Sequence, residues 1–351
     1  VISHSTGGQI IFNDTISGSG AYIAKFDTIG SFLWSYPVFI TGQSTITGAL
    51  DLDNNGNVIA SFTGNSSQDT AKIIKLDANG YLINEVAFAF SNGVPSMSVN
   101  SLETDANNNI FIVFKQYLPA SGAGMVLRKY DQNLNLLWQK AAGSSNNAPT
   151  NAAIFNFTLT TDNNNNVIIN GLFAGIASFD GNTITSTGGT NARNNFFVKY
   201  DPNGNLIWLN SYASSGIPIT FQPDINKIEV DSSGNIYAFG NVSGTQFSFN
   251  GTNYNNSDPQ LWLLKLDPNG QELWSHLAGN VGAVQSYESG LDMSIRGNNL
   301  FITGALAGGG LSLHTVIFDT IQTNALGNLF VASYSLDGNV QFVKTQQLTT
   351  L

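Results

Sequence analysis

The chain has 351 residues, of which 42% are hydrophobic, 11% are aromatic and only 10% are charged. This composition excludes a disordered protein, and the absence of cysteine excludes disulfides and thiolate metal sites. The net charge of −10 argues against binding to nucleic acid or to an anionic membrane surface, and no apolar run is long enough for a transmembrane helix.

Two short motifs alternate along the whole chain, and each is typical of a β-hairpin. In both, apolar and β-branched residues flank a turn that begins with Asp and has Gly or Asn three residues later. The Asp side chain can accept hydrogen bonds from the turn backbone, and Gly or Asn tolerates the left-handed conformation. The first motif occurs at 1–13, 50–64, 102–114, 159–171, 228–240 and 293–304, and the second at 23–34, 73–84, 127–138, 199–208, 263–274 and 331–342.

The alternation of the motifs predicts the fold. Two hairpins make one four-stranded antiparallel sheet with strands a, b, c and d, in which the first motif joins a to b and the second joins c to d. Six such sheets predict an all-β chain that forms one domain over 1–351, a single six-bladed β-propeller. The predicted blades cover about 1–42, 43–92, 93–145, 146–215, 216–280 and 281–351.

Two residue types recur at fixed positions of the second motif. A lysine stands two residues before the turn Asp, and a tryptophan stands seven residues after it. The lysines are Lys25, Lys75, Lys129, Lys199 and Lys265, and the tryptophans are Trp34, Trp138, Trp208 and Trp274. We interpret both as structural, the tryptophans as packing between blades.

The repeats resemble a known family. NNFFVKYDPNGNLIWLNSY (194–212) with INKIEVDSSGNIYAFGNVSG (225–244), and the insert FDGNTITSTGGTNARNNFFVKYD (179–201), resemble the SBBP-type β-propeller repeats of secreted and surface proteins from Bacteroidetes-like bacteria and some giant viruses. The resemblance covers essentially the whole chain. It implies a propeller and an extracellular or cell-surface location with the signal removed, and it implies no particular activity. KLDPNGQELW (265–274) is also similar to quinoprotein repeats.

The acidic residues of one turn are a candidate calcium site. Asp51, Asp53 and Asn55 could begin a calcium loop, but the usual acidic ligand several residues later is missing from 56–62. We therefore expect no metal and no cofactor, and we interpret Asp53, like Asp201, as a device that caps its own turn.

Catalytic signatures are missing from the sequence. The three histidines are dispersed, and the only arginines, Arg128, Arg193 and Arg296, are too scattered to grip a substrate carboxylate as in six-bladed sialidases. We therefore expect no enzymatic activity.

Four Asp-Thr-aliphatic or Asp-Thr-Ala tripeptides resemble the O-glycosylation motif that Bacteroidetes use on exported proteins. They contain Thr15, Thr28, Thr70 and Thr320, which are the predicted glycosylation sites.

The long connections predict where function lies. In a four-stranded blade the Asp turns leave one face, and the b–c loops and d–a crossovers leave the other. The longest of these irregular segments are about 175–194, 244–260 and 307–328, with the crossovers 141–153 and 212–224. Long loops on a rigid scaffold are the usual carriers of binding residues. The aromatic or charged candidates on them are Arg193, Phe221, Tyr254, Asp258 and His314.

The sequence therefore predicts a non-enzymatic extracellular or cell-surface module, in part of a larger surface complex, that binds a protein or glycan through this loop face. Two alternatives stay open. One is a lectin-like propeller, for which binding pockets should repeat around the ring. The other is a quinone-dependent sugar dehydrogenase, which would need calcium and basic residues around its cofactor.

Overall fold

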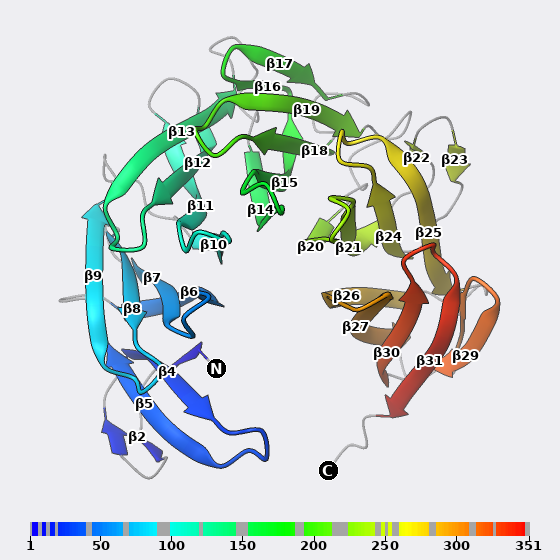
Figure 1. Cartoon of the computed structure of the whole chain (residues 1–351). Helices are drawn as coiled ribbons and strands as arrows, with labels where there is room; N and C mark the ends of the chain where they lie inside the picture. Colours follow the sequence, from blue (N-terminus) through cyan, green and yellow to red (C-terminus); the bar gives the residue numbers. More distant parts are fainter. Residues whose placement is uncertain are drawn as a thin grey trace. The chain divides into compact units, whose positions relative to one another are not determined.

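The computed structural model contains only β-strands and their turns in the residues that it describes, which confirms the all-β prediction (Figure 1). No helix in this part of the chain could cross a membrane. The described residues are 2–5, 9–11, 15–17, 20–39, 44–65, 70–89, 99–118, 122–144, 154–186, 193–212, 224–242, 247–249, 252–254, 260–280, 286–308, 314–325 and 328–347.

The chain divides into two compact units, described separately below. The first takes residues 1–119 and 123–142, and the second takes 120–122 and 143–351.

The first unit contains sheets 1 to 3. Sheet 1 has the order β1 (Ile2–Ser5), β4 (Gly20–Phe26) and β5 (Phe32–Val38), and a separate hairpin is formed by β2 (Gln9–Ile11) and β3 (Thr15–Ser17). Sheet 2 has the order β6 (Ser44–Leu52), β7 (Val58–Asn65), β8 (Thr70–Leu76) and β9 (Leu82–Ala89). Sheet 3 is built from β10 (Val99–Thr104), β11 (Ile110–Leu118), β12 (Gly122–Tyr130) and β13 (Leu136–Ser144).

The second unit contains sheets 4 to 6. Sheet 4 is β14 (Ile154–Thr161), β15 (Val167–Ala174), β18 (Arg193–Tyr200) and β19 (Leu206–Tyr212). Sheet 5 is β20 (Asp224–Val230), β21 (Ile236–Val242), β24 (Gln260–Leu266) and β25 (Glu272–Asn280). Sheet 6 is β26 (Ser286–Arg296), β27 (Asn299–Gly308), β30 (Asn328–Ser335) and β31 (Val340–Gln347).

Sheets 2 to 6 therefore have the predicted order a-b-c-d of consecutive antiparallel strands. Sheet 1 does not, and the a–b hairpin predicted at 1–13 is wrong. Strand β1 pairs directly with strand c, with Ile2 opposite Ile23, so β1 is itself strand b. β2 (Gln9–Ile11) is likewise paired with β3 and not with β1, so the two halves of 1–13 belong to different hydrogen-bonded pairs. Among the described residues, sheet 1 has no strand a.

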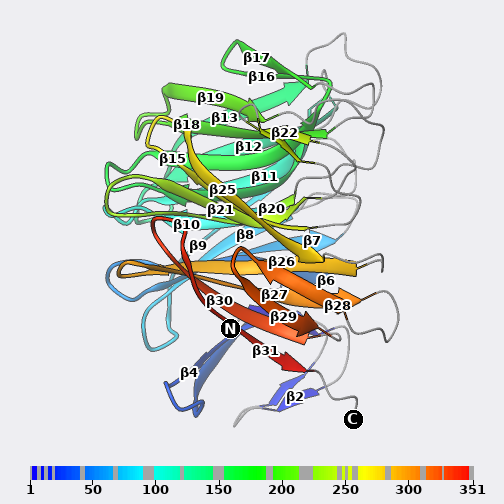
Figure 2. The same cartoon turned by 90° about the vertical axis from the view of Figure 1, so that its right-hand side faces the viewer.

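The predicted b–c loops also differ from expectation, because each of the three long ones contains a hairpin. These hairpins are β16 (Ile176–Phe179) with β17 (Asn182–Thr185), β22 (Phe247–Phe249) with β23 (Thr252–Tyr254), and β28 (His314–Phe318) with β29 (Ile321–Ala325). β28 pairs with β25 and thereby extends sheet 5 by two strands, as seen beside β25 in Figure 2.

The Asp turns have the predicted chemistry. In the c–d turn of sheet 4, Asp201 Oδ1 accepts hydrogen bonds from the backbone N–H groups of Asn203 and Asn205, each at 2.8 Å. Gly204 has a φ of 82°, a conformation that glycine adopts without steric cost. The interpretation that Asp201 stabilises its own turn is confirmed.

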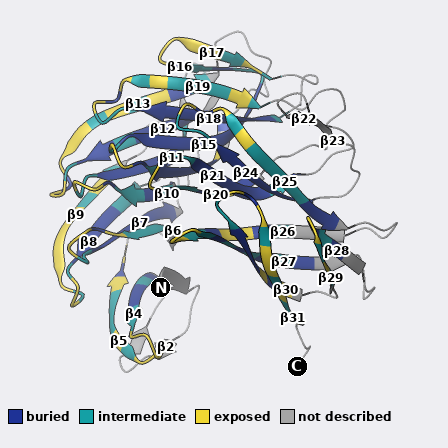
Figure 3. Cartoon of the chain, turned by 45° about the vertical axis from the view of Figure 1, so that its right-hand side comes forward, coloured by how far each residue is buried: buried dark blue, intermediate teal, exposed yellow. Residues whose placement is uncertain are grey.

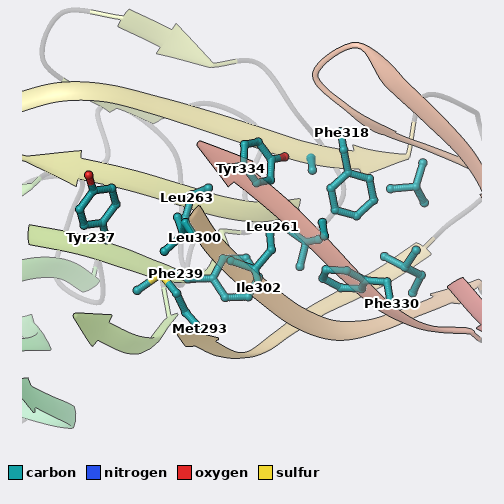
Figure 4. Close-up of a cluster of buried hydrophobic side chains, with 14 residues drawn as sticks. Tyr237, Phe239, Leu261, Leu263, Met293, Leu300, Ile302, Phe318, Phe330 and Tyr334 are labelled. Atoms are coloured by element: carbon teal, nitrogen blue, oxygen red, sulfur yellow. The ribbon is translucent and has the colours of Figure 1, made fainter. Parts of the chain in front are cut away.

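Burial separates the inner strands from the outer one. Strands b and c are mostly buried, whereas strand d carries exposed residues along much of its length, as β8 and β9 illustrate in Figure 3. The buried side chains form clusters between neighbouring sheets of one unit. One such cluster packs sheet 5 against sheet 6 and is drawn in Figure 4.

Candidate functional site

Three of the five recurring lysines are buried and paired with the Asp of their own sheet's a–b turn. Lys75 Nζ lies 2.9 Å from Asp53 Oδ2 in sheet 2, and Lys199 Nζ lies 2.8 Å from Asp162 Oδ2 in sheet 4. In sheet 3 the distance from Lys129 Nζ to the carboxylate is 3.6 Å. At most 6% of each of these side chains is exposed, so the pairs lie in a medium where an unpaired charge is costly.

The paired aspartates are also bonded to their turns. Asp162 accepts hydrogen bonds from the backbone N–H groups of Asn164 and Asn166 and from the Asn166 side chain. Burial alone would raise the pKa of Asp162, but the hydrogen bonds from Lys199 and Asn166 outweigh it and hold the pKa below its ordinary value. The same balance, with Lys75 and Asn57 as donors, lowers the pKa of Asp53.

These lowered pKa values predict acid sensitivity. A carboxyl group whose pKa is lower in the folded state stabilises the fold above its unfolded pKa, near 4, and loses that contribution as the pH falls through the folded value. We expect the urea midpoint of unfolding to be steady near pH 6 and to fall below about pH 4. The Asp162→Asn variant should show a shallower fall. A midpoint that is unchanged at pH 3 would contradict this.

Hydrogen bonds from side chains to backbone carbonyls link each sheet to the next one of its unit. Lys199 Nζ and Trp208 Nε1 both donate to the carbonyl oxygen of Pro268, in the c–d turn of the next sheet, at 3.2 and 3.1 Å. Lys25 and Trp34 share the carbonyl of Ala78 in the same way. Lys265 and Trp274 share that of Leu336, and Lys75 donates to Gln132. The structural interpretation of these lysines and of Trp34, Trp208 and Trp274 is confirmed.

Lys25 and Lys265 have no such carboxylate pair among the described residues, and Lys25 is only half-buried. Its ammonium group donates to Ala78 O at 2.8 Å, but no carboxylate of the described residues pairs with it. Lys25 lines a cleft between sheets 1 and 2. This cleft lies on the side of the Asp turns, where the sequence predicted only structure.

The candidate calcium ligands point to other partners. Asp53 is held by Lys75, and Asp51 Oδ2 accepts hydrogen bonds from the backbone and hydroxyl of Thr104 at 2.7 and 2.8 Å. Asn55 contributes its backbone N–H to Asp53. Within the described part of the chain, no three His, Cys, Asp or Glu side chains gather as a metal site would require.

The predicted partner-binding residues are only partly placed by the structure. Arg193 begins β18, and its side chain is half-buried. Tyr254 ends β23 and His314 begins β28, so these two lie on different b–c hairpins. Phe221 and Asp258 lie outside the described residues. The structure therefore puts three of the five on or next to b–c hairpins without showing them converge.

Sequence reasoning missed a contact between a histidine and a carboxylate that links one of these hairpins to sheet 5. His276 Nδ1 on β25 lies 2.8 Å from Asp319 Oδ1 in the β28–β29 turn. The His276 ring also packs on Trp274, with centroids 5.0 Å apart. The sequence signal that could have revealed the β16–β17 hairpin is the Asp-Gly pair at 180–181, which is typical of tight hairpin turns. In the structure both residues have the positive φ that such a turn requires.

Two of the predicted glycosylation sites are exposed turn residues. Thr28 lies in the c–d turn of sheet 1, and Thr320 lies in the β28–β29 turn next to Asp319. Thr15 and Thr70 begin strands β3 and β8. The Asp before Thr28 caps its turn through backbone hydrogen bonds, so turn formation also explains that motif. Glycosylation stays a prediction.

Comparison with known proteins gives no family assignment. No family model matches the chain, and no curated protein matches it. Solved structures with a similar fold include a polysaccharide lyase described as an ulvan lyase, with 11% identity, 93% of this chain and 86% of that chain covered, and a TM-score of 0.49.

Two further solved structures are similar. For a streptogramin B lyase the identity is 11%, the coverage is 93% of this chain and 87% of that chain, and the TM-score is 0.44. For a protein of unknown function from Bacteroides caccae the identity is 11%, the coverage is 75% and 76%, and the TM-score is 0.36. The activities of these proteins are not carried over to this chain.

Proposed function

We propose that the six repeats close into a single six-bladed β-propeller that is exported, lies at the cell surface, and binds a protein partner without catalysing a reaction. Its support is the uniform a-b-c-d order of sheets 2 to 6 and the lysine and tryptophan links between successive sheets of each unit. Repetition of this kind is how a propeller protects its sheet edges.

The observation that carries the binding role is the difference between the two ends of the strands. At the turn end, the turn carboxylates, such as Asp162 and Asp201, are bonded to their own turns. At the b–c end, the second unit carries three successive hairpins that a four-stranded sheet does not need. Hairpins on a rigid scaffold offer a surface that can vary while the core is kept.

The hairpin side chains suit a polar interface. On β17, Asn182, Thr183 and Thr185 are exposed, and on β29 Gln322 is exposed. These groups donate and accept hydrogen bonds without the desolvation cost of buried charges. The turn carboxylates of the described residues, such as Asp162 and Asp201, accept hydrogen bonds within their own turns, which supports a non-enzymatic role.

An alanine scan tests the proposed binding role. A partner is first captured by affinity purification from the native host with the complex kept intact, and its affinity is then measured by calorimetry. Thr183→Ala combined with Thr185→Ala, and separately Gln322→Ala, should weaken binding by at least about tenfold. Ser232→Ala, in an exposed a–b turn, is the matched control and should leave the affinity unchanged. Unchanged affinity in all hairpin variants, or a loss confined to the control, would refute the proposal.

The same polar side chains favour glycan as the second candidate ligand. Amides and hydroxyls hydrogen-bond readily to sugar hydroxyls, so a glycan array on the purified chain separates the two candidates. Binding to one glycan class that Gln322→Ala abolishes would replace the protein partner by a glycan.

A further inference from the structure

One c–d turn of the first unit has an unusual backbone conformation for its residue. The third residue after the start of every c–d turn has a positive φ, and it is glycine in all of them except sheet 3, where it is Leu134 with a φ of 64°. The other non-glycine residues with positive φ in the described chain are all Asn or Asp. A bulky side chain in this conformation is strained, because its Cβ crowds the backbone. Such strain persists where the surrounding contacts compensate for it.

The strand that faces this turn also departs from the repeat. Strand d of sheet 2 carries Asn84 where sheets 1, 4 and 5 carry the tryptophan that reaches the next sheet. The Asn84 side chain donates to the carbonyl oxygen of Asn133, directly before Leu134. Leu134 is 5% exposed and lies in the cluster between sheets 2 and 3, against which Val86 and Phe88 of β9 also pack. Because alternate residues of a strand share a face, Asn84 lies on the same side of β9 as these two.

The turn glycines show why the two departures occur together. A methyl group added to Gly80, the turn glycine of sheet 2, would meet ring atoms of Trp34 at 2.7 Å. The tryptophans of sheets 4 and 5 would lie 3.2 and 3.1 Å from such a group on the turn glycine of the next sheet. Each of these tryptophans therefore leaves no room for a side chain in the turn that it faces. The smaller Asn84 leaves the room that Leu134 fills.

We propose that Asn84 and Leu134 form a specificity pair, through which the face of sheet 2 selects the turn of sheet 3 as its neighbour. A glycine turn would leave the space beside Asn84 empty, and the Leu134 turn would collide with a sheet that carries the tryptophan. Chains of similar repeats are prone to misassembly and to exchange of repeats between copies. A pair that fits one neighbour and rejects the others opposes both errors, because specificity needs a repulsive element as well as an attractive one.

Coupled substitutions in the whole chain test the fit of this pair. Leu134→Gly should lower the urea midpoint of unfolding by opening a cavity, and Asn84→Trp should lower it because the ring meets Leu134. Together they rebuild the contact seen between Trp34 and Gly80, so the double variant should recover at least about half of the summed loss. Losses that simply add, or a double variant that fails to fold, would overturn the proposal. So would a Leu134→Gly variant as stable as the wild type.

Refolding separates a specificity pair from one that only fills space. The double variant has a stable contact, but it is the same contact that neighbouring sheets use. After dilution from urea it should therefore give at least about threefold more oligomer than the wild type, measured by size-exclusion chromatography with light scattering. Ala87→Ser, on the exposed side of β9, is the matched control and should refold like the wild type. If the double variant also refolds without added oligomer, the pair does not select its neighbour and the proposal is wrong.

Discussion

Replacing Lys199 by methionine is expected to lower the free energy of unfolding by about 3–5 kcal/mol, because it leaves a buried carboxylate without its cation. The Asp162 side chain is 3% exposed, and its distance to the lost ammonium group is 2.8 Å. The same substitution removes the donor to Pro268 O in the next sheet. Methionine fills a similar volume, so the loss reports the charge and the hydrogen bonds rather than a cavity.

Urea unfolding at pH 7 measures this effect. The control is Lys72→Met, whose pair with Glu85 is equally short at 2.9 Å but lies at the surface, where such pairs contribute about 1 kcal/mol or less. The double variant Lys199→Met with Asp162→Asn should recover part of the loss, because it removes the unpaired charge. If Lys199→Met and Lys72→Met cost the same, the buried pair has no special structural role.

Replacing Phe239 by alanine is expected to cost about 3–5 kcal/mol by creating a cavity in the core. Phe239 lies on β21, is fully buried, and belongs to the cluster between sheets 5 and 6 with Met293 and Ile302 (Figure 4). Its ring lies directly over Gly290 of β26, where a methyl group added to the glycine would meet ring atoms at 2.7 Å. Backbone atoms on that side restrict how far the site can collapse.

The matched control is Phe342→Ala on β31, since that ring is 37% exposed and should cost about 1 kcal/mol or less. Denaturant midpoints measured for both variants under the same conditions give the comparison. A loss at Phe239 no larger than that at Phe342 would show that sheets 5 and 6 do not depend on this cluster.

Most of the sheet structure could be predicted from the sequence because its signals are local. The Asp201 turn needs only residues within four positions, and the period of Lys and Trp shows that one contact is made repeatedly. A weak local match is ambiguous. The stretches 1–13 and 293–304 both lack the turn Asp, yet 293–304 forms the predicted hairpin, whereas the strand at Ile2–Ser5 pairs as strand b.

The candidate site was less predictable than the sheets. The period of the lysines shows that they recur, but their partners, such as Asp53 for Lys75 and Asp162 for Lys199, stand on another hairpin of the same sheet and appear only in the fold. The b–c segments were predicted as irregular loops because their hairpin strands are only three to five residues long. Such strands are too short for an alternating pattern to stand out.

The bond from a recurring lysine to the turn carbonyl of the next repeat has a consequence for how such a chain can change in length. In three repeats a Lys and a Trp share one acceptor of the next repeat, as Lys199 and Trp208 share Pro268 O. The acceptor is a backbone oxygen, so it is present whatever residue occupies the position, as Ala78, Gln132, Pro268 and Leu336 show. A duplicated repeat would therefore carry both the donors and the acceptor of this contact. The number of repeats could change without any new interface having to evolve.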